Sequence, residues 1–279
     1  MNNKKINLIL IGFIIATLAG GFWYYRRTHP KYVPLPPRPE VTLTIIPGWN
    51  LRQVAEYLVN KGFASSTSQV YRYTGEPAKV YSKPWNTEIP SLANDFANRP
   101  PLQSFEGYLA PDTYQVYKDA ALREIIVKLL LQRNDEVDYQ EIRRIEKESG
   151  HSWHEILTMA SLVEKEARTP EDMALVADIF WRRNKIKWAL QSCATVNYIT
   201  GKNDPAVSGK DKAIDSLYNT YKYPGLPPGP ISNPGLVAIT AVLYPTQNNY
   251  WYFMSDTDGK MHYAKTLEEH GLNRARFLN

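Results

Sequence analysis

The feature that most restricts this chain is an apolar run of about twenty residues near its N-terminus. Residues 6–25 read INLILIGFIIATLAGGFWYY, and only Asn7 and Thr17 interrupt the apolar character. A run of this length forms a continuous helix long enough to span a bilayer. Its last three residues are aromatic, the type that collects at lipid headgroups. We therefore predict a single transmembrane helix over residues 6–25, preceded by a short N-terminal segment of residues 1–5.

Two questions about this segment stay open: whether it is cleaved, and which way it is oriented in the membrane. A cleaved signal peptide is the alternative, with TLA before Gly20 as the candidate cleavage site. The aromatic end and the continued apolar length favour an uncleaved anchor. Lys4 and Lys5 precede the run, whereas four basic residues follow it within residues 26–38. The positive-inside rule, used alone, would keep the body of the protein in the cytoplasm.

The remaining composition is that of a folded protein. The 279 residues are 43% hydrophobic and 22% charged, which argues against general disorder. The 19 Tyr and 7 Trp residues suit stacking on sugar rings and equally an aromatic-rich core. The net charge is +5, but no long Lys/Arg run is present, so no nucleic-acid partner is predicted. An anionic polymer or a membrane surface stays open on charge alone.

Neither a disulfide framework nor a metal or cofactor is predicted. Cys193 is the single cysteine, which excludes an internal disulfide and a CxxC metal site. We interpret it as a small packed residue, because no motif pairs it with a histidine. His262 and His270 lie near the C-terminus and are interpreted as structural. No HExxH or similar ligand spacing is present.

Three soluble segments follow the apolar run. Residues 26–39 are Pro-rich and predict a stiff, extended linker. Residues 40–100 predict a small α/β module, with an alternating strand from Val41 and a helix capped by Asn50. A change in composition near Pro100 marks a boundary, so residues 101–279 form the last domain.

The last domain mixes helices with short strands. A helix is predicted from about Ala121 to Asn134, one from Trp153, and one in EDMALVADIFWRRNKI after residue 170. The segment YWYFMSDTDGKMHYAKT predicts a hairpin, since a DxDG turn separates two aromatic strands. The fold class is therefore α+β, a small α/β subdomain followed by a mixed domain behind a membrane anchor.

The helix from Trp153 carries two glutamates that differ in position. Its start, SWHE, is a capping box with Ser at the cap and Glu three residues later. At about 100° per residue, Glu164 falls near 80° from Ile156, inside the apolar face. Lys165 points away from that face, and Glu166 falls at its far edge. We therefore predict that Lys165 and Glu166 face solvent.

A carboxylate on an apolar face is either paired or shifted toward its neutral form. A neutral carboxyl group near neutral pH can serve as a general acid. A buried, paired structural glutamate is the alternative for Glu164, and helical spacing does not separate the two.

Five motifs give the chain a family resemblance. They are EGYLAPDTY (106–114), ASLVEKEA (160–167), LQSCATVNY (190–198), NTYKYPGLPPGPISNPG (219–235) and YFMSDTDGKMHYAKTLEEH (252–270). In this order they resemble motifs of the YceG-like endolytic murein transglycosylases. Two positions depart from that pattern, because Cys193 stands where Asp is common and Ala110 where an aromatic residue is common. The segment IIPGWNLRQVAEYL is similar to the family's LysM-like subdomain.

The resemblance implies an activity. It implies cleavage of MurNAc–GlcNAc bonds inside peptidoglycan strands, without water, to give 1,6-anhydroMurNAc ends. One carboxyl group suffices, first as the acid for the leaving oxygen and then as the base for the C6 hydroxyl group. An ordinary glycosidase uses two carboxyl groups instead. The family's catalytic glutamate corresponds to Glu164.

Other motif residues are expected to contact substrate or to support the catalytic group. They are Glu106, Tyr108, Asp112, Tyr114, Gln191, Asn219 and Tyr221. For Glu106 and Asp112, holding a loop is an equally good interpretation. The prolines and glycines of GLPPGP are expected to shape a wall of the cleft.

The resemblance also implies where the protein acts and with what. Residues 40–100 would be the LysM-like subdomain, which either binds glycan or only supports the catalytic domain of residues 101–279. Peptidoglycan strands are the expected partner, and peptidoglycan synthases are further candidates. Because peptidoglycan lies outside the cytoplasmic membrane, the catalytic domain is expected outside and the N-terminus inside. A two-carboxylate muramidase and a non-catalytic glycan-binding scaffold remain as alternatives.

Overall fold

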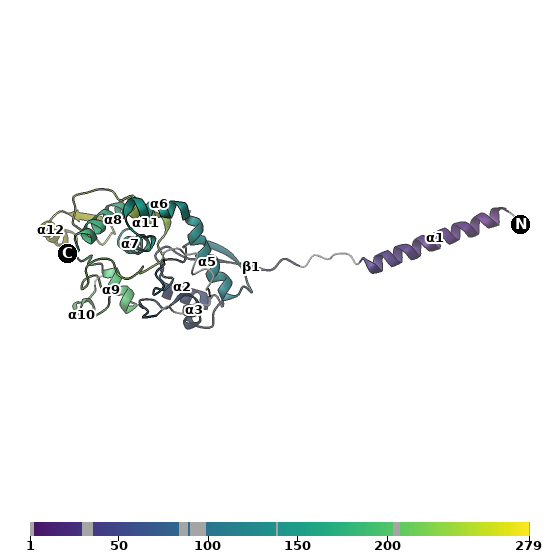
Figure 1. Cartoon of the computed structure of the whole chain (residues 1–279), viewed down its shortest axis with the longest axis horizontal. Coiled ribbons are helices and arrows are strands. Elements are labelled where there is room, and N and C mark those ends of the chain that lie inside the picture. Colours follow the sequence, from purple (N-terminus) through teal and green to yellow (C-terminus); the bar gives the residue numbers. More distant parts are fainter. Residues whose placement is uncertain are drawn as a thin grey trace. The chain divides into compact units, whose positions relative to one another are not determined.

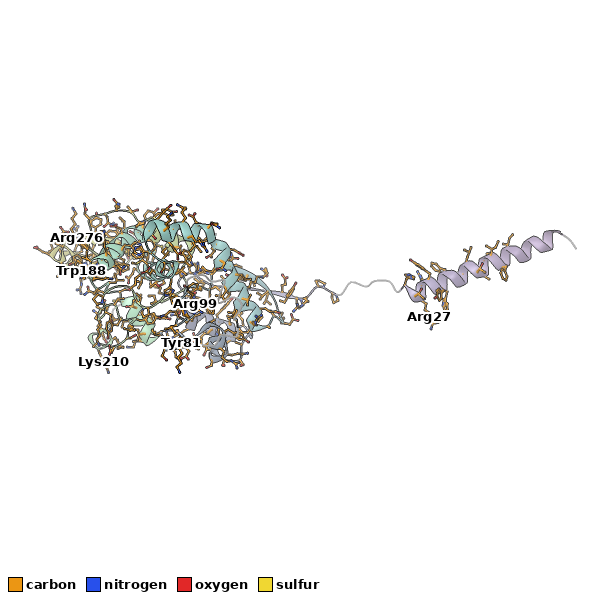
Figure 2. The ribbon with its side chains drawn as sticks, in the orientation of Figure 1. Arg27, Tyr81, Arg99, Trp188, Lys210 and Arg276 are labelled. Atoms are coloured by element: carbon orange, nitrogen blue, oxygen red, sulfur yellow. The ribbon has the colours of Figure 1, made fainter. Side chains whose placement is uncertain are left out.

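The computed structural model describes residues 3–29, 36–83, 89, 99–137, 139–202 and 207–278. It contains two units, Met1–Pro39 and Glu40–Asn279. The first unit holds helix α1, Asn3–Thr28 (Figure 1), in which the Arg27 guanidinium lies 5.1 Å from the Trp23 ring centroid (Figure 2). Within the described residues, no helix reaches both the length and the apolar content needed to cross a membrane.

The second unit begins with a β-α-α-β arrangement. Among the described residues of this part, strand β1 (Glu40–Thr44), helix α2 (Leu51–Asn60), helix α3 (Thr67–Thr74) and strand β2 (Thr113–Tyr117) come in this order. The two strands pair antiparallel, with Leu43 opposite Tyr114. The predicted strand and helix are confirmed, and Asn50 caps α2 as expected.

The boundary predicted near residue 100 does not separate two bodies. It falls between the two strands of one sheet, since β1 pairs with β2 on the far side of it. Residues 40–279 accordingly form one compact unit. Most of the segment from 84 to 98 lies outside the described residues, so the sequence signals there remain predictions.

Helices make up most of the remaining unit. They are α5 (Leu122–Glu136), α6 (Tyr139–Ser149), α7 (Trp153–Glu166), α8 (Pro170–Lys185), α9 (Cys193–Thr200), α10 (Gly209–Lys212), α11 (Leu236–Leu243) and α12 (Leu267–Phe277). The predicted hairpin is confirmed as β3 (Tyr252–Ser255) and β4 (Met261–Ala264). Trp188, labelled in Figure 2, stacks on Trp251 beside this hairpin, with ring centroids 5.5 Å apart. The mixed α+β class is confirmed.

Helix α7 is the central element of this unit. The capping box is present, because Ser152 accepts from the Glu155 N–H and Glu155 accepts from the Ser152 N–H. Every residue from Ile156 to Val163 is buried, and helices α8 and α11 pack against α7 (Figure 1). A helix that is buried on all sides has no solvated face along most of its length. After Val163, its last turn reaches the surface again.

Candidate active site

Glu164 lies in that last turn, where α7 leaves the core. Its side chain is half-buried, and Oε2 accepts a hydrogen bond from the Gly235 N–H at 3.0 Å. The backbone of Gly48 also lies close to Glu164, because a Cβ atom placed on Gly48 would stand 3.4 Å from Glu164 Cγ. Within the described part of the chain, Oε1 accepts no hydrogen bond from protein. One oxygen is therefore held in place and the other is available to a ligand.

The prediction that Glu164 sits inside an apolar face needs correction. Because α7 is buried all round up to Val163, angle around the helix does not distinguish one side from another. Position along the axis does, because Glu164 follows the last fully buried residue.

Two hollows share Glu164 in their lining, and together they are called the cleft below. One hollow of about 460 Å³ is lined on its floor and walls by Asp112, Gln132, Glu136, Met173 and Leu236. A second hollow of about 280 Å³ is lined by Lys165, Glu166 and the hairpin turn from Ser255 to Gly259. Glu164 and Arg168 line both hollows. A carboxylate at the junction of two hollows suits a polymer that extends in both directions from the reacting bond.

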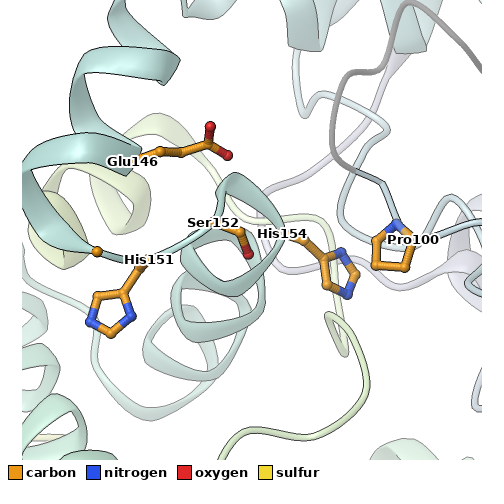
Figure 3. A pocket seen from close by; sticks show the side chains of 6 residues that line it. Pro100, Glu146, His151, Ser152 and His154 are labelled. Atoms are coloured by element: carbon orange, nitrogen blue, oxygen red, sulfur yellow. The ribbon is translucent and has the colours of Figure 1, made fainter.

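A wider hollow of about 570 Å³ lies at the opposite end of α7 (Figure 3). It is lined by Pro100, Glu146, Gly150, Ser152 and two histidines, His151 and His154. The His151 ring stacks on Trp181, with ring centroids 3.9 Å apart. The two ring nitrogens of His154 lie 2.9 Å from the Tyr108 hydroxyl group and 2.9 Å from the Pro228 carbonyl oxygen. Burial lowers the pKa of His154, which favours the neutral ring. We therefore interpret His154, at this end of α7, as a structural residue.

Glu106 is buried away from the cleft. It is 1% exposed and receives hydrogen bonds from the Leu51 N–H, the Tyr198 hydroxyl group and the Asn233 amide, at 3.0 to 3.3 Å. Burial raises the pKa of Glu106 to about 8, and the bonds from Leu51 and Tyr198 oppose that rise. Its carboxyl group thus joins α2, α9 and the loop before α11. It has no access to a ligand.

Three other predicted site residues are also buried in the protein. Tyr114 donates to the Ala110 carbonyl oxygen at 2.6 Å. The Asn219 amide donates to the carbonyl oxygens of Lys212 and Ile214. With Tyr108, which bonds His154, these side chains fix loops and do not line the cleft.

Asp112 is the second predicted residue that reaches the cleft. Its side chain is exposed, and Gln132 donates to Oδ2 at 3.0 Å while the Thr113 N–H donates to Oδ1 at 2.7 Å. The first hollow thus contains the carboxyl groups of Asp112, Glu136 and Glu164, and the second contains those of Glu164, Glu166 and Asp256.

The motifs around Gln191 and Tyr221 meet behind the end of α7. Gln191 has a φ of +57° and its N–H bonds the Thr220 carbonyl oxygen. The Tyr221 hydroxyl group lies 3.1 Å from Cys193 Sγ, so Cys193 occupies a packed contact with a tyrosine. Neither Gln191 nor Tyr221 lines the two hollows beside Glu164.

The prediction that Glu166 faces solvent is wrong. The Ser192 hydroxyl group donates a hydrogen bond to its carboxylate, and burial raises the pKa of Glu166. The residue before Cys193 therefore holds Glu166. Lys165 is exposed as predicted.

Sequence reasoning missed the part played by α5. Arg133 is 1% exposed, bonds Glu136 and the Pro234 carbonyl oxygen, and so reaches the loop that presents Gly235. The signal was present in the sequence. Arg133 continues the apolar spacing of Ile126, Leu129 and Leu130, so the helical test that singled out Glu164 also selects it.

His262, in the C-terminal motif, has a structural part in the hairpin. His262 bonds Asp256 at 2.8 Å within the hairpin and stacks on Phe277. Among the described residues no group of His, Cys, Asp or Glu side chains is arranged to hold a metal ion.

Comparison with known proteins identifies the family. The model of the YceG-like family matches residues 29–276. The chain belongs to the YceG-like family. This confirms the family predicted from the five motifs.

Individual YceG-like relatives agree with that assignment. An endolytic murein transglycosylase from Bacillus subtilis is 34% identical over 239 residues, covering 85% of this chain and 65% of that protein. One from Streptococcus pneumoniae is 32% identical over 255 residues, covering 85% of this chain and 45% of that protein. The crystal structure of a YceG-like protein from Listeria monocytogenes has a TM-score of 0.69 and 30% identity, over 83% of this chain and 75% of that chain. The chain therefore spans just under two thirds of one curated relative and less than half of the other.

Proposed function

We propose that this chain is an endolytic lytic transglycosylase that cleaves MurNAc–GlcNAc bonds within peptidoglycan strands. One observation supports it most. Glu164 offers a free carboxyl oxygen at the junction of two hollows, in a chain whose curated relatives are named endolytic murein transglycosylases.

Glu164 performs both proton transfers in this proposal. It first gives its proton to the glycosidic oxygen, so that the GlcNAc side leaves as an alcohol. The carboxylate then accepts the proton of the MurNAc C6 hydroxyl group, whose oxygen bonds C1. The product is a 1,6-anhydro ring, no water is consumed, and Glu164 ends protonated as it began. The Gly235 N–H stabilises the anion formed between the two steps.

A muramidase is the second candidate, and one observation favours considering it. Asp112 and Glu136 line the same cleft as Glu164, so a second carboxyl group is at hand to activate water. Glu106 is not suited to that part, because it is buried among protein donors. The products differ, since hydrolysis leaves a reducing MurNAc end.

The deciding experiment is Glu164→Gln, assayed on isolated glycan strands with mass spectrometry of the products. We expect wild-type protein to yield anhydroMurNAc ends and the variant to lose cleavage by about 100- to 10,000-fold. Glu268→Gln, in the exposed first turn of α12 and outside both hollows, is a matched control that should keep activity. Reducing ends from wild type would establish the hydrolase, and unchanged cleavage by Glu164→Gln would remove Glu164 from the reaction. Binding without cleavage by wild type would favour a glycan-binding scaffold.

We further propose that residues 6–25 anchor the chain in the cytoplasmic membrane with the catalytic unit outside. The apolar run and its aromatic end support this, and the location of peptidoglycan requires it, although the flanking charges point the other way. The β-α-α-β order of β1, α2, α3 and β2 supports a LysM-like subdomain that contacts glycan, and synthases are proposed partners. A reporter that works only outside the cytoplasm should be active when it is fused to the C-terminus. Activity of a C-terminal reporter that works only in the cytoplasm would overturn the orientation.

A further inference from the structure

Arg133 is a buried charge that the proposed reaction does not yet use. It lies in the last turn of α5, is 1% exposed, and forms an ion pair with Glu136 at 2.5 Å. Burial lowers the pKa of Arg133, while the charges of Glu136 and Glu164 oppose that effect. A buried guanidinium group is expensive to keep unless each partner is well placed. Its partners therefore indicate what it holds.

One of those partners is the peptide group that bonds Glu164. Arg133 donates to the Pro234 carbonyl oxygen at 2.7 Å, and the Gly235 N–H donates to Glu164 Oε2 at 3.0 Å. These carbonyl and N–H groups belong to one planar peptide unit, which is trans. In a trans peptide they point in opposite directions. The chain of contacts is thus Arg133, peptide unit, Glu164 carboxylate.

This arrangement has two physical effects. The bond from Arg133 fixes the rotation of the peptide plane, so the N–H stays aimed at Glu164. A positive charge on the carbonyl side also polarises the peptide group, which strengthens the N–H as a donor. Glu136 in turn accepts a hydrogen bond from Nη1 of Arg133, while Nη2 bonds Pro234, so Glu136 holds the guanidinium group and partly offsets its charge.

We propose that Arg133 is a positioning residue for Glu164, acting through the Pro234–Gly235 peptide unit, with Glu136 as the group that orients Arg133. The inference rests on the proposed function of Glu164 as the acid and base. Arg133 itself does not line the cleft, so it touches no substrate. It favours the Glu164 anion that forms when the leaving oxygen takes the proton.

Two variants of this ion pair are expected to act in opposite directions. Activity falls on the alkaline side once Glu164 can no longer supply a proton. Arg133→Met removes a positive charge, so the alkaline limb of the kcat profile should move to higher pH, and kcat should fall by about 10- to 100-fold with little change in KM. Glu136→Gln removes a negative charge and keeps an acceptor for Arg133, so the limb should move to lower pH.

Arg182→Met is the matched control. Arg182 forms a similar pair with Asp178 at 2.9 Å and also bonds a backbone carbonyl group, that of Tyr250, but it lines neither hollow. The Arg182 side chain is 26% exposed against 1% for Arg133, so Arg182→Met should lose less stability, and it should leave the pH profile of kcat unchanged. Displacements of the same sign in Arg133→Met and Glu136→Gln would overturn the proposal, as would no displacement in either.

An NMR measurement reads the same link without activity. With carbonyl-labelled proline and amide-labelled glycine, only the four Pro–Gly pairs of the chain report, at Gly48, Gly225, Gly229 and Gly235. In the full chain the Gly235 amide should titrate with pH, and Glu164→Gln should abolish that titration. Arg133→Met should move its midpoint up and Glu136→Gln should move it down.

The two assays separate failure of the inference from failure of the proposed function. A wild-type protein that cleaves no glycan but shows these Gly235 titrations disproves the function and keeps the link from Arg133 to Glu164. A protein that cleaves glycan, with a Gly235 titration that neither variant moves, keeps the function and disproves the link. If Arg133→Met does not fold, the pH profile of kcat and the Gly235 titration of Glu136→Gln still test the proposal.

Discussion

Glu106 and Glu164 are bound by the same device in two different places. Each carboxyl group accepts a hydrogen bond from a backbone N–H at the start of a helix, Leu51 of α2 for Glu106 and Gly235 before α11 for Glu164. The start of a helix favours a negative group because its N–H groups lack partners within the helix. By this local criterion, the two residues are equivalent.

Their surroundings make them different. Glu106 is 1% exposed and has further donors in Tyr198 and Asn233, whereas Glu164 is half-buried and keeps one oxygen toward the cleft. The hydrogen bonds of the Glu106 carboxyl group all go to protein groups, whereas one oxygen of Glu164 is available to a ligand. The difference teaches that a hydrogen bond from a helix start orients a carboxylate, while access decides whether it can react.

The largest expected effect separates the two residues by stability. Glu106→Ala leaves buried donors of Leu51, Tyr198 and Asn233 without a partner, and each stranded group costs about 1–3 kcal/mol. We expect the free energy of unfolding to fall by about 3 kcal/mol, against less than about 1 kcal/mol for Glu164→Ala. Chemical denaturation of the full chain measures both. Equal losses would mean that Glu164 also supports the fold.

Glu106→Gln is the companion variant, because it keeps the shape and stays neutral. Since burial raises the pKa of Glu106 to about 8, from 4.5 when unfolded, the folded protein keeps this proton across that range. Stability from this group is present at low pH and is lost as pH rises through the folded value. The free energy of unfolding of wild type should therefore fall relative to that of the variant as pH rises from about 4.5 to about 8. A difference that is constant over this range would show that Glu106 is ionised throughout.

Local sequence signals predicted the elements well. The caps at Asn50 and Ser152, the helices they begin and the hairpin around Gly259 are present, because short-range geometry determines them. The boundary near residue 100 failed for a long-range reason. Pairing between β1 and β2 joins segments some seventy residues apart, and no local pattern records which strands will pair.

The candidate site shows the same division. Glu164 was found from the sequence, but the reason first given for it, an apolar helical face, does not hold where α7 is enclosed by α8 and α11. Glu166 was misjudged because its partner, Ser192, lies in another segment. Tertiary neighbours decide exposure, and a helical wheel contains none of them. For Arg133 the opposite is true, because its position on the apolar face of its helix predicts burial, and we did not make that prediction.

The smallest expected effect tests how closely the backbone encloses Glu164, using two glycines with nearly the same conformation. Gly48 has a φ of +81° and Gly62 a φ of +82°, so alanine at either position costs about 1 kcal/mol of unfolding free energy. A Cβ atom at Gly48 would stand 3.4 Å from Glu164 Cγ, whereas at Gly62 nothing lies within 4 Å. Backbone strain is thus the same, and the two positions differ in the contacts of the added Cβ atom with Glu164 and, at 3.8 Å, with Lys165. We expect equal losses of stability and a fall in kcat of about three- to tenfold for Gly48→Ala alone. Equal kcat values in the two variants would show that Glu164 is held by Gly235 without help from the Gly48 turn, and the enclosure of the carboxylate would then be one-sided.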